Sequence, residues 1–461
     1  MHRDYDNIVD KNRTGDDVVI IGRGVDLGRV RPPFGGILIA MLASMLAMSA
    51  ACAPRSDRGV AEHRAALARA MSAGDAAAIA REVESLRQAL GDRTGLPETP
   101  DRYERAPDDV AALGAEEARS AVAPVLARMA AHHDWSTPVD PRTLDLPLRD
   151  AAEIVVGALN LRRVDPAQIE PAMALARTAG DFLLHAQSAA GTGGFPFPAS
   201  RGASDAEAFR ASRKFLDAAE REGRLDRVLR NGWIVDDLGD GGLQFDNGEC
   251  GVAMLALHAA TGEAKYLASA RAAADWAIRQ PLATNWNYNS FSVYLLTEAW
   301  VATGDTRYRD AALEKARLGV IPGQLRAGPR AGRWLDPHNA RPAYHYIMLR
   351  ALARLLAALP AHHEAREDID TALRLGLSAR NHDFTDADAG VANKDQAWQA
   401  LLAAARAYAD RPDTRKETGT DAALDSLRRL SAAQWRRGHM PMSPQSFGLL
   451  LADAVGPRGI R

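Results

Sequence analysis

The chain has 461 residues, of which 47% are hydrophobic and 25% are charged, as in a soluble globular protein. Its 57 Lys and Arg residues nearly balance its 59 Asp and Glu residues, giving a net charge of -2. Nucleic-acid binding normally requires a basic surface, so we exclude nucleic acid as a partner. The two cysteines, Cys52 and Cys250, are too few for a disulfide framework.

Residues 1–52 have the layout of an export signal. Arg29 and Arg31 precede an apolar run over residues 34–51, and small residues follow. The sequence Ser49-Ala50-Ala51-Cys52 resembles a bacterial lipobox. We therefore expect a leader with a lipoprotein-type signal peptide and lipidation at Cys52. The protein would then be exported, either as a membrane-anchored lipoprotein of the cell envelope or as a periplasmic or secreted protein. The alternative is an uncleaved membrane anchor.

Residues 53–107 predict an N-terminal helical tether. Two stretches, Val60–Ala73 and Asp75–Leu90, have helical patterns, and a Gly- and Pro-containing segment follows them. We expect this part to connect the leader to the main domain and not to carry catalytic residues.

Residues 108–456 predict helices throughout, because Ala and Leu dominate and strand-forming runs are sparse. The helical patterns form six consecutive pairs. In chain order they are Ala111–Ala131 with Leu148–Leu161, Pro166–Ala189 with Asn247–Ala260, Glu263–Arg279 with Asn289–Ala302, Asp305–Gly319 with Asn339–Leu359, His363–Arg380 with Asn393–Tyr408, and Thr420–Arg437 with Pro444–Val455.

The two members of a pair differ in their hydrophobic pattern. Glu263–Arg279 is amphipathic and can face water on one side, whereas Asn247–Ala260 is apolar on all sides and must be buried. An inner ring of buried helices inside an outer ring of amphipathic helices satisfies both patterns. The spacing from Thr261 to Thr303 is 42 residues (303−261), which indicates an internal repeat.

The joints between helices alternate between two kinds. Short joints read Thr261-Gly262-Glu263-Ala264-Lys265-Tyr266 and Thr303-Gly304-Asp305-Thr306-Arg307-Tyr308, while the opposite joints are long, aromatic and rich in Asn. Helix pairs with such joints resemble the (α/α)6 toroid of the six-hairpin glycosidase superfamily, over roughly residues 108–455. The resemblance implies an all-α fold and a funnel at the N-terminal ends of the inner helices. It also implies action on a carbohydrate, as a glycoside hydrolase, polysaccharide lyase or epimerase.

Aromatic and polar residues gather in the long joints, where we expect the substrate to bind. Flat aromatic rings can stack on the apolar faces of sugars, although they could equally plug the mouth of the ring. The longest joint, residues 190–246, predicts a lid or wall of the funnel. The candidate substrate-binding residues are Phe195, Trp233, Trp286, Asn287, Tyr288, Asn289, Trp334, His338, Asn339 and Arg341.

The Asn residues at the predicted starts of inner helices have two interpretations. Asn247, Asn289, Asn339 and Asn393 recur there, and Asn is a favoured N-cap, so helix capping is the simpler account. The functional alternative is that their amides, together with the helix N-termini, converge on a hydroxylated or anionic substrate.

Carboxylates at the same end of the ring suggest hydrolysis, which generally needs one protonated and one ionised carboxyl. Asp246 or Glu249 opposite Asp336 is the pair that we expect to act in a glycoside hydrolase. The rim also contains further acidic residues, namely Asp236, Asp237, Asp240, Asp386, Asp388 and Asp395.

A lyase acting on a uronate polymer by β-elimination is the alternative enzyme. It would need a base, a proton donor and a group that neutralises the uronate carboxylate. His338, Arg341 and His345 share one helical face, and Tyr344 is next to His345. His345 and Tyr344 would then be the catalytic residues.

A non-catalytic glycan-binding or cell-envelope scaffold protein is the remaining alternative, since a fold does not fix a function. The partner is in each case an oligo- or polysaccharide, and a membrane is contacted only through a lipid at Cys52. The segment from Asp386 to Gly390 lacks the later acidic ligand of a calcium loop, and we expect neither a metal nor a cofactor.

Overall fold

The computed structural model describes residues 55–97, 101, 105–136, 148–195, 221, 244–386 and 394–456. Cys52, Trp233, Asp236, Asp237, Asp240 and Asp388 therefore lie outside the described residues, as do most of the 190–246 joint and the whole predicted leader. In the described residues every regular element is a helix, which confirms the predicted all-α class.

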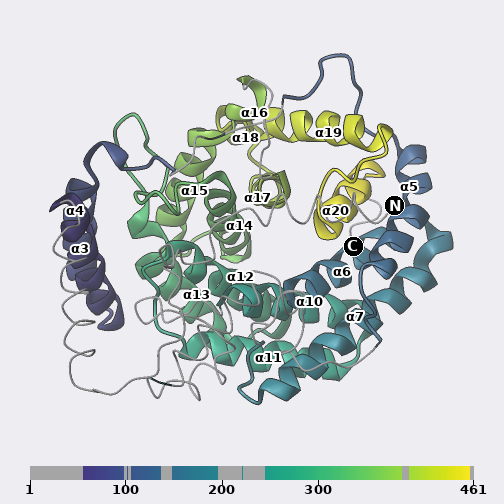
Figure 1. The fold of residues 1–461 in the computed structure, drawn as a ribbon, viewed down its shortest axis with the longest axis horizontal. Coiled ribbons are helices and arrows are strands. Elements are labelled where there is room, and N and C mark those ends of the chain that lie inside the picture. The colour runs from purple at the N-terminus through teal and green to yellow at the C-terminus, as the bar shows by residue number, and fades with distance from the viewer. Residues whose placement is uncertain are drawn as a thin grey trace, which may run out of the picture.

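Six helices form a closed inner ring. Each packs against the next, and the last packs against the first. Figure 1 shows them around the centre of the molecule. The inner helices are α6 (Leu148–Leu161), α10 (Gln244–Thr261), α12 (Trp286–Thr303), α14 (Pro342–Ala358), α17 (Lys394–Ala407) and α20 (Pro444–Ala454).

Six amphipathic helices surround this ring. Each inner helix packs against the outer helix that follows it in the chain, and α20 packs against the first outer helix, which completes the toroid. The outer helices are α5 (Ala115–Ala131), α7 (Ile169–Ala190), α11 (Ala264–Arg279), α13 (Thr306–Gly319), α15 (Arg366–Arg380) and α19 (Thr420–Arg436). The short helices are α16 (Asp383–Asp386), α18 (Pro412–Glu417) and the 3-10 turns η1 (Gly91–Arg93), η2 (Pro166–Gln168) and η3 (Ile321–Gly323).

Glycines allow the first and last inner helices to close the ring. A Cβ atom on Gly157 of α6 would lie 2.7 Å from the carbonyl oxygen of Pro444, and one on Gly448 of α20 would lie 2.8 Å from the carbonyl oxygen of Gly157. Neither distance is compatible with a side chain, so the two backbones can approach this closely only because both residues lack one.

The short joints lie at the C-terminal ends of the inner helices, as predicted. Gly262 and Gly304 have φ values of 73° and 71°, a left-handed conformation that ends a helix and that glycine adopts without strain. The Tyr that closes each joint then reaches the preceding outer helix. Tyr266 Oη donates to Asp181 of α7 at 2.9 Å, and Tyr308 Oη donates to Asp275 of α11 at 3.1 Å. The repeated motif therefore links successive outer helices by a hydrogen bond.

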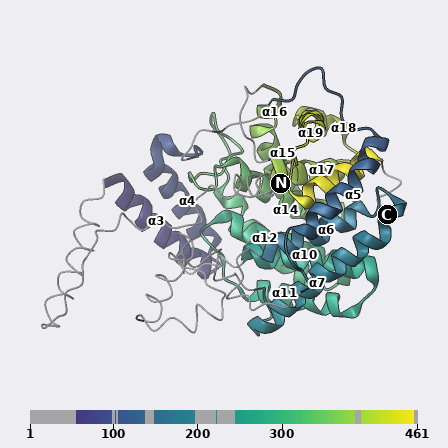
Figure 2. The same ribbon diagram turned by 45° about the vertical axis from the view of Figure 1, so that its right-hand side comes forward.

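The N-terminal extension is a helical hairpin of α3 (Arg55–Ser72) and α4 (Ala76–Leu90) beside the ring (Figure 2). It is attached to the loop that precedes α14. Gly95 N donates to the carbonyl oxygen of Leu335 at 2.8 Å, and Arg330 Nη1 donates to that of Thr94 at 3.0 Å. Asp101 forms an ion pair with the fully buried Arg380 at 2.5 Å. These contacts fix the hairpin against the side of the ring that carries the long joints.

Candidate active site

The centre of the ring is reached by one face of each inner helix. Glu153, Glu249 and Gln399 are each the sixth residue of their helix, counted from Leu148, Gln244 and Lys394. All three side chains are half-buried although their helices belong to the interior of the molecule. This register places three polar groups near the axis of the toroid, in the N-terminal half of the inner helices.

Glu249 forms an ion pair that crosses the ring interior. The Arg350 guanidinium of α14 contacts both carboxylate oxygens, with Nη1 at 3.5 Å from Oε2 and Nη2 closer still to Oε1. The α10 and α14 helices both flank α12, so the pair spans this intervening helix. The guanidinium lies over the ring of Tyr294 from α12, 4.4 Å from the ring centroid. Arg350 therefore lies at the meeting point of three inner helices.

A chain of hydrogen bonds continues from Arg350 to the last two inner helices. Arg350 Nη1 donates to Gln399 Oε1 of α17, and Gln399 Nε2 donates to Ser446 Oγ of α20 at 2.9 Å. Asp395 of α17 accepts from the backbone N–H of Ser443 at 2.6 Å, just before α20. Polar groups from α10, α14, α17 and α20 thus form one connected belt.

The surroundings of Glu153 favour the protonated form of its carboxyl. Its burial in the ring interior raises the pKa of Glu153 well above the ordinary range. The negative charges of Asp150, Asp395 and Glu249 raise this pKa further, and the positive charge of Arg149 opposes them. Glu153 and Glu249 therefore lie in opposite electrostatic surroundings, since Glu249 is paired with an arginine.

Asp246 lies one turn before Glu249 and is fully buried. Its carboxylate faces Arg149 of α6 at 3.9 Å. The same guanidinium lies over the ring of Phe245 at 4.2 Å, and Phe245 in turn stacks on Phe291 at 4.2 Å. The two acids predicted on α10 thus differ in access: Glu249 is half-buried at the ring interior, whereas Asp246 is packed between α10 and α6.

Asp336, the predicted partner of these acids, holds the loop before α14. It is only 4% exposed, and its oxygens accept from the backbone N–H of Asn339 at 2.9 Å and from its side-chain amide at 3.0 and 3.1 Å. Asn339 Oδ1 then accepts from the backbone N–H of Asn287 at 3.1 Å, which ties this loop to α12. A catalytic role for Asp336 stays a prediction that these contacts do not require.

The aromatic residues predicted to stack on a sugar lie in the core, which corrects that expectation. Trp286, Trp334 and Phe195 are 1%, 0% and 1% exposed. Trp286 packs so closely on Gly323 that a Cβ there would lie 2.5 Å from the indole ring, and Trp334 Nε1 donates to the Val320 carbonyl oxygen at 3.0 Å. None of the three offers a ring face to a ligand, because each plugs the space between helices.

Asn247, Asn289 and His345 are each the fourth residue of an inner helix and bond to the outer ring. Their side-chain nitrogens Nδ2, Nδ2 and Nε2 lie within hydrogen-bond distance of the carbonyl oxygens of Ala273, Gly319 and Gly376, at 3.1, 2.6 and 2.9 Å. All three residues are fully buried. This shared role replaces both the N-cap and the ligand-binding interpretations of Asn247 and Asn289.

His345 is also corrected as a catalytic candidate. Its ring is fully buried, with its edge against Trp334 at 5.3 Å between centroids. Burial first, and then the positive charge of Arg380, hold the pKa of His345 well below its usual range. The imidazole is therefore neutral and turned toward α15, away from the ring axis.

The other predicted lyase residues do come together, at the rim between α12 and α14. The Tyr344 ring stacks on His338 at 4.6 Å, and the Arg341 guanidinium lies 4.5 Å from the Tyr344 ring centroid. Arg341 Nη2 lies 2.6 Å from His338 Nδ1, and Asn285 Nδ2 lies 3.2 Å from His338 Nε2. His338, Arg341 and Tyr344 are half-buried, so a ligand at the rim can reach them.

The remaining polar candidates of this rim differ in access. Tyr288 is half-buried, whereas Asn287 is fully buried and donates through Nδ2 to Asn285 Oδ1 at 2.6 Å and to Asn339 Oδ1 at 2.9 Å. The amides of Asn287 and Asn339 thus bind each other between α12 and the loop before α14. Their burial corrects the expectation that these two side chains contact the substrate.

Glu153 and Arg350 were missed by sequence reasoning. Both lie inside helices, whereas most of the residues that the sequence predicts for the site are polar or aromatic residues of the joints. A charged residue within an apolar helix is a usable sign, since such residues are rarely buried without a partner or a function. Glu153, in the otherwise apolar stretch from Ala151 to Ala158, fits that description.

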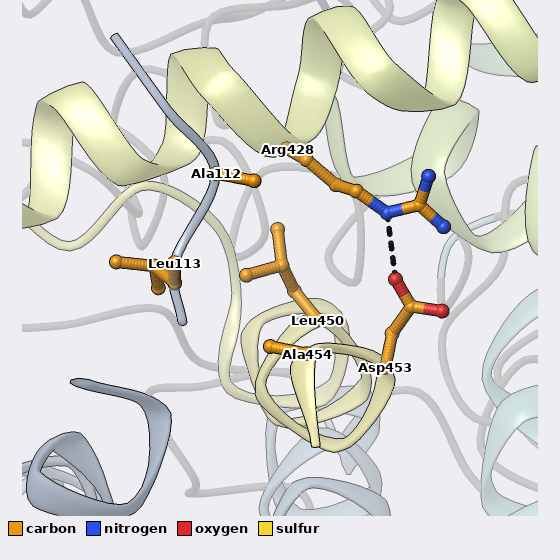
Figure 3. A pocket seen from close by; sticks show the side chains of 6 residues that line it. All are labelled: Ala112, Leu113, Arg428, Leu450, Asp453 and Ala454. Atoms are coloured by element: carbon orange, nitrogen blue, oxygen red, sulfur yellow. Dashed lines mark hydrogen bonds and ion pairs between the residues drawn. The ribbon is translucent and has the colours of Figure 1, made fainter. Parts of the chain in front are cut away.

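A small cavity lies outside this region, at the opposite end of α20 (Figure 3). Its volume is about 170 Å³, and it is lined by Ala112, Leu113, Arg428, Leu450, Asp453 and Ala454. The two charged groups in its wall satisfy each other, because Arg428 Nε donates to Asp453 Oδ2 at 2.7 Å. The charged side chains of the cavity therefore already pair with each other.

The described residues provide no obvious metal site, since no three of their His, Cys, Asp or Glu side chains are arranged to hold an ion. Within the same residues, no helix combines the length and the apolar character needed to cross a lipid bilayer.

The helical ring defines the fold class as an α/α toroid. No family model matches the chain, and no curated protein matches it. Among solved structures, the unsaturated glucuronyl hydrolase from Streptococcus agalactiae is similar, with a TM-score of 0.44 and 13% sequence identity over 77% of this chain and 96% of that one. A similarity of this degree carries no conclusion about the reaction or the catalytic residues.

Proposed function

We propose that this protein is a glycoside hydrolase whose reaction takes place at the centre of the ring, with Glu153 and Glu249 as the two carboxyls. One observation carries the proposal. Glu153 on α6 and Glu249 on the adjacent α10 occupy the same helical register at the ring interior, and only Glu249 pairs with Arg350. Burial and neighbouring carboxylates also raise the pKa of Glu153. Two carboxyl groups in opposite electrostatic surroundings are what acid-assisted hydrolysis of a glycoside requires.

The roles follow from these surroundings. Glu153 donates its proton to the glycosidic oxygen as the bond from that oxygen to the anomeric carbon breaks. Glu249 accepts a proton from the water that attacks the anomeric carbon, or attacks that carbon itself before water releases the sugar. In the first route the proton gained by Glu249 returns to solvent, and Glu153 is protonated again from solvent. In the second route the water that releases the sugar gives its proton to Glu153, and Glu249 leaves the anomeric carbon as a carboxylate.

Replacing Glu153 by Gln tests the role of the proton donor. For a natural glycoside, kcat should fall by roughly 10²–10⁴-fold, the usual contribution of a general acid. An aryl glycoside with a nitrophenolate leaving group needs no proton to depart, so its kcat should fall much less. Glu298→Gln is a control for the loss of a carboxyl elsewhere on an inner helix, because Glu298 lies in the C-terminal half of α12 and pairs with Arg354. Equal losses for both substrates in Glu153→Gln would refute the acid role.

The rim cluster of His338, Arg341 and Tyr344 supports a lyase as the second candidate. A histidine, a tyrosine and an arginine in contact supply the groups that β-elimination from a uronate needs: a base, a proton donor and a cation for the carboxylate. The products separate the two enzymes, because a lyase forms an unsaturated sugar that absorbs in the near ultraviolet and a hydrolase forms only a new reducing end. Loss of an ultraviolet-absorbing product in Tyr344→Phe would favour the lyase.

Saccharide binding without turnover is the outcome expected of the remaining alternative, a glycan-binding or scaffold protein. Export and lipidation at Cys52 are also proposed, on the sequence pattern alone. The mass of the mature N-terminus, compared between the wild type and Cys52→Ala, tests this point, because only the wild type should carry acyl chains.

A further inference from the structure

Two arginines one turn apart on α14, Arg350 and Arg354, form ion pairs with different helices. Arg354 contacts Glu298 of the neighbouring α12 through Nε and Nη2, at 2.5 and 2.9 Å. Arg350 passes over Tyr294 of α12 and reaches Glu249 on α10, the helix beyond. The first pair fastens neighbours, whereas the second extends across the ring interior to a residue of the proposed catalytic pair.

We propose that Arg350 is a positioning residue of the proposed active site, which fixes the orientation of the Glu249 carboxylate and is itself held by Gln399. This inference rests on the proposed hydrolase function. It gives the buried guanidinium of Arg350 a role in the reaction.

The geometry of the contacts carries this role. Arg350 offers Nη1 and Nη2 to the two oxygens of one carboxylate, an arrangement that sets the direction of the carboxylate as well as its position. Only the planar guanidinium can do so, because a lysine ammonium is a point charge without a preferred plane. With its side chain only 6% exposed, Arg350 has little freedom to change this geometry.

Gln399 determines where the guanidinium lies. Its Nε2 donates to Ser446 Oγ at 2.9 Å, which leaves Oε1 facing Arg350 Nη1. Ser446 is fully buried near the start of α20, and its Oγ donates to the backbone carbonyl oxygen of Asp395 at 3.4 Å. Contacts thus run from Glu249 on α10 through Arg350 to Gln399 on α17 and Ser446 on α20. The packing of α17 against α20 therefore helps to set the orientation of Glu249.

Charged and aromatic groups surround the proposed pair. Arg350 faces Glu249 of α10 and both Tyr294 and Glu298 of α12. Glu153 faces Asp150 and Arg149 of its own helix, Glu249 of α10 and Asp395 of α17. Arg350 therefore acts on Glu249 directly, and a change at Arg350 should alter the catalytic step more than substrate binding.

Arg350→Lys compared with Arg354→Lys tests the proposal in the full-length protein. Arg350→Lys should lower kcat by roughly 10- to 100-fold, the cost of a slightly misplaced group, with less than about a threefold change in KM. Arg354→Lys makes the same chemical change in a pair that does not touch Glu249, so its kcat and KM should match those of the wild type.

Gln399→Met provides a second variant that leaves the ion pair intact, should Arg350→Lys fold poorly. It removes only the acceptor and donor of the amide, and kcat should fall by about 3- to 10-fold with less than about a threefold change in KM. Equal kcat losses in the Arg350 and Arg354 variants, or a loss confined to KM, would overturn the positioning role. If the wild type hydrolyses no glycoside, the proposed function itself fails; if it does and these variants behave alike, only the positioning role fails.

Discussion

Polar residues at two positions of the inner helices behave in opposite ways. The fourth residues Asn247, Asn289 and His345 of α10, α12 and α14 are fully buried and bond to carbonyl groups of the outer helices. The sixth residues Glu153, Glu249 and Gln399 of α6, α10 and α17 are half-buried and face the ring interior. Two residues turn an α-helix by about 200°, so the two positions point to nearly opposite sides. Polar residues at the fourth position therefore serve the fold, and those at the sixth position are available for the proposed chemistry.

This contrast shows that residue type alone is a poor guide to function in a ring of helices. An Asn or His near the start of an inner helix suggests a ligand contact, and yet in three consecutive inner helices it fastens the two rings together. The helical register decides the outcome, because it fixes whether a side chain faces the axis or the outer ring.

Asn289→Ala should give the largest loss of stability. Asn289 accepts from Ala283 N at 2.8 Å and donates to the carbonyl oxygens of Ala283 and Gly319 at 2.7 and 2.6 Å. Truncation leaves three buried backbone groups without partners, so the free energy of unfolding should fall by about 3–5 kcal/mol. Urea unfolding measures this loss. The kcat of the folded fraction should not change, and a fall in kcat at unchanged stability would contradict the structural role.

Trp334→Phe should give the next largest effect. The smaller ring leaves a void and removes the hydrogen bond to Val320, which together should cost about 2 kcal/mol. KM for any saccharide should stay at the wild-type value, because the indole is fully buried. A KM that rises without a change in stability would restore Trp334 as a substrate-binding residue.

Much of the fold could be predicted because the signals that specify it are local. The periodicity of hydrophobic residues distinguishes the buried helices from the amphipathic ones. A glycine followed by an acidic residue indicates each short joint. The predicted starts of the inner helices are less accurate. The helices α12 and α10 begin at Trp286 and Gln244, three residues before the predicted Asn289 and Asn247. Residues predicted in the joints therefore belong to the first helical turns. The polar side chains in those turns are satisfied by distant carbonyl groups, which no local pattern reveals.

The candidate site could be predicted only in part. The sequence predicts Glu249 as a catalytic residue with a partner in a loop, at Asp336, whereas the proposed partner Glu153 lies on α6. Glu153 and Arg350 come from helices far apart in the sequence, and the electrostatics of Glu153 arise only when α6, α10 and α17 meet. Without the register of all six inner helices, the sequence does not show which charges share the axis.

His345→Asn should have a smaller, pH-dependent effect, and it introduces the residue found at the two equivalent positions. The pKa of His345 is lowered in the folded state, so below the ordinary value of about 6.5 the unfolded chain binds a proton that the native protein does not. Its contribution to the free energy of unfolding should therefore fall by up to about 1.4 kcal/mol per pH unit as the pH decreases below 6.5.

Chemical denaturation at pH 8, 6 and 5 measures this dependence. The wild type should lose stability faster than His345→Asn over the acidic steps, and both should have the same pH–rate profile once corrected for folding. A catalytic role for His345 would instead appear as a lost limb in the profile of the variant.

Leu449→Gln should give the smallest effect and tests the sixth position where it is apolar. Leu449 is the sixth residue of α20, counted from Pro444, and it is half-buried. If this register faces a solvent-accessible axis, as for Gln399 on the neighbouring α17, a glutamine should be tolerated with a loss of about 1 kcal/mol or less. Thermal and urea unfolding give the value. A loss as large as that of Asn289→Ala would mean that the axis at α20 is packed like a core, and that the accessible sixth position is limited to α6, α10 and α17.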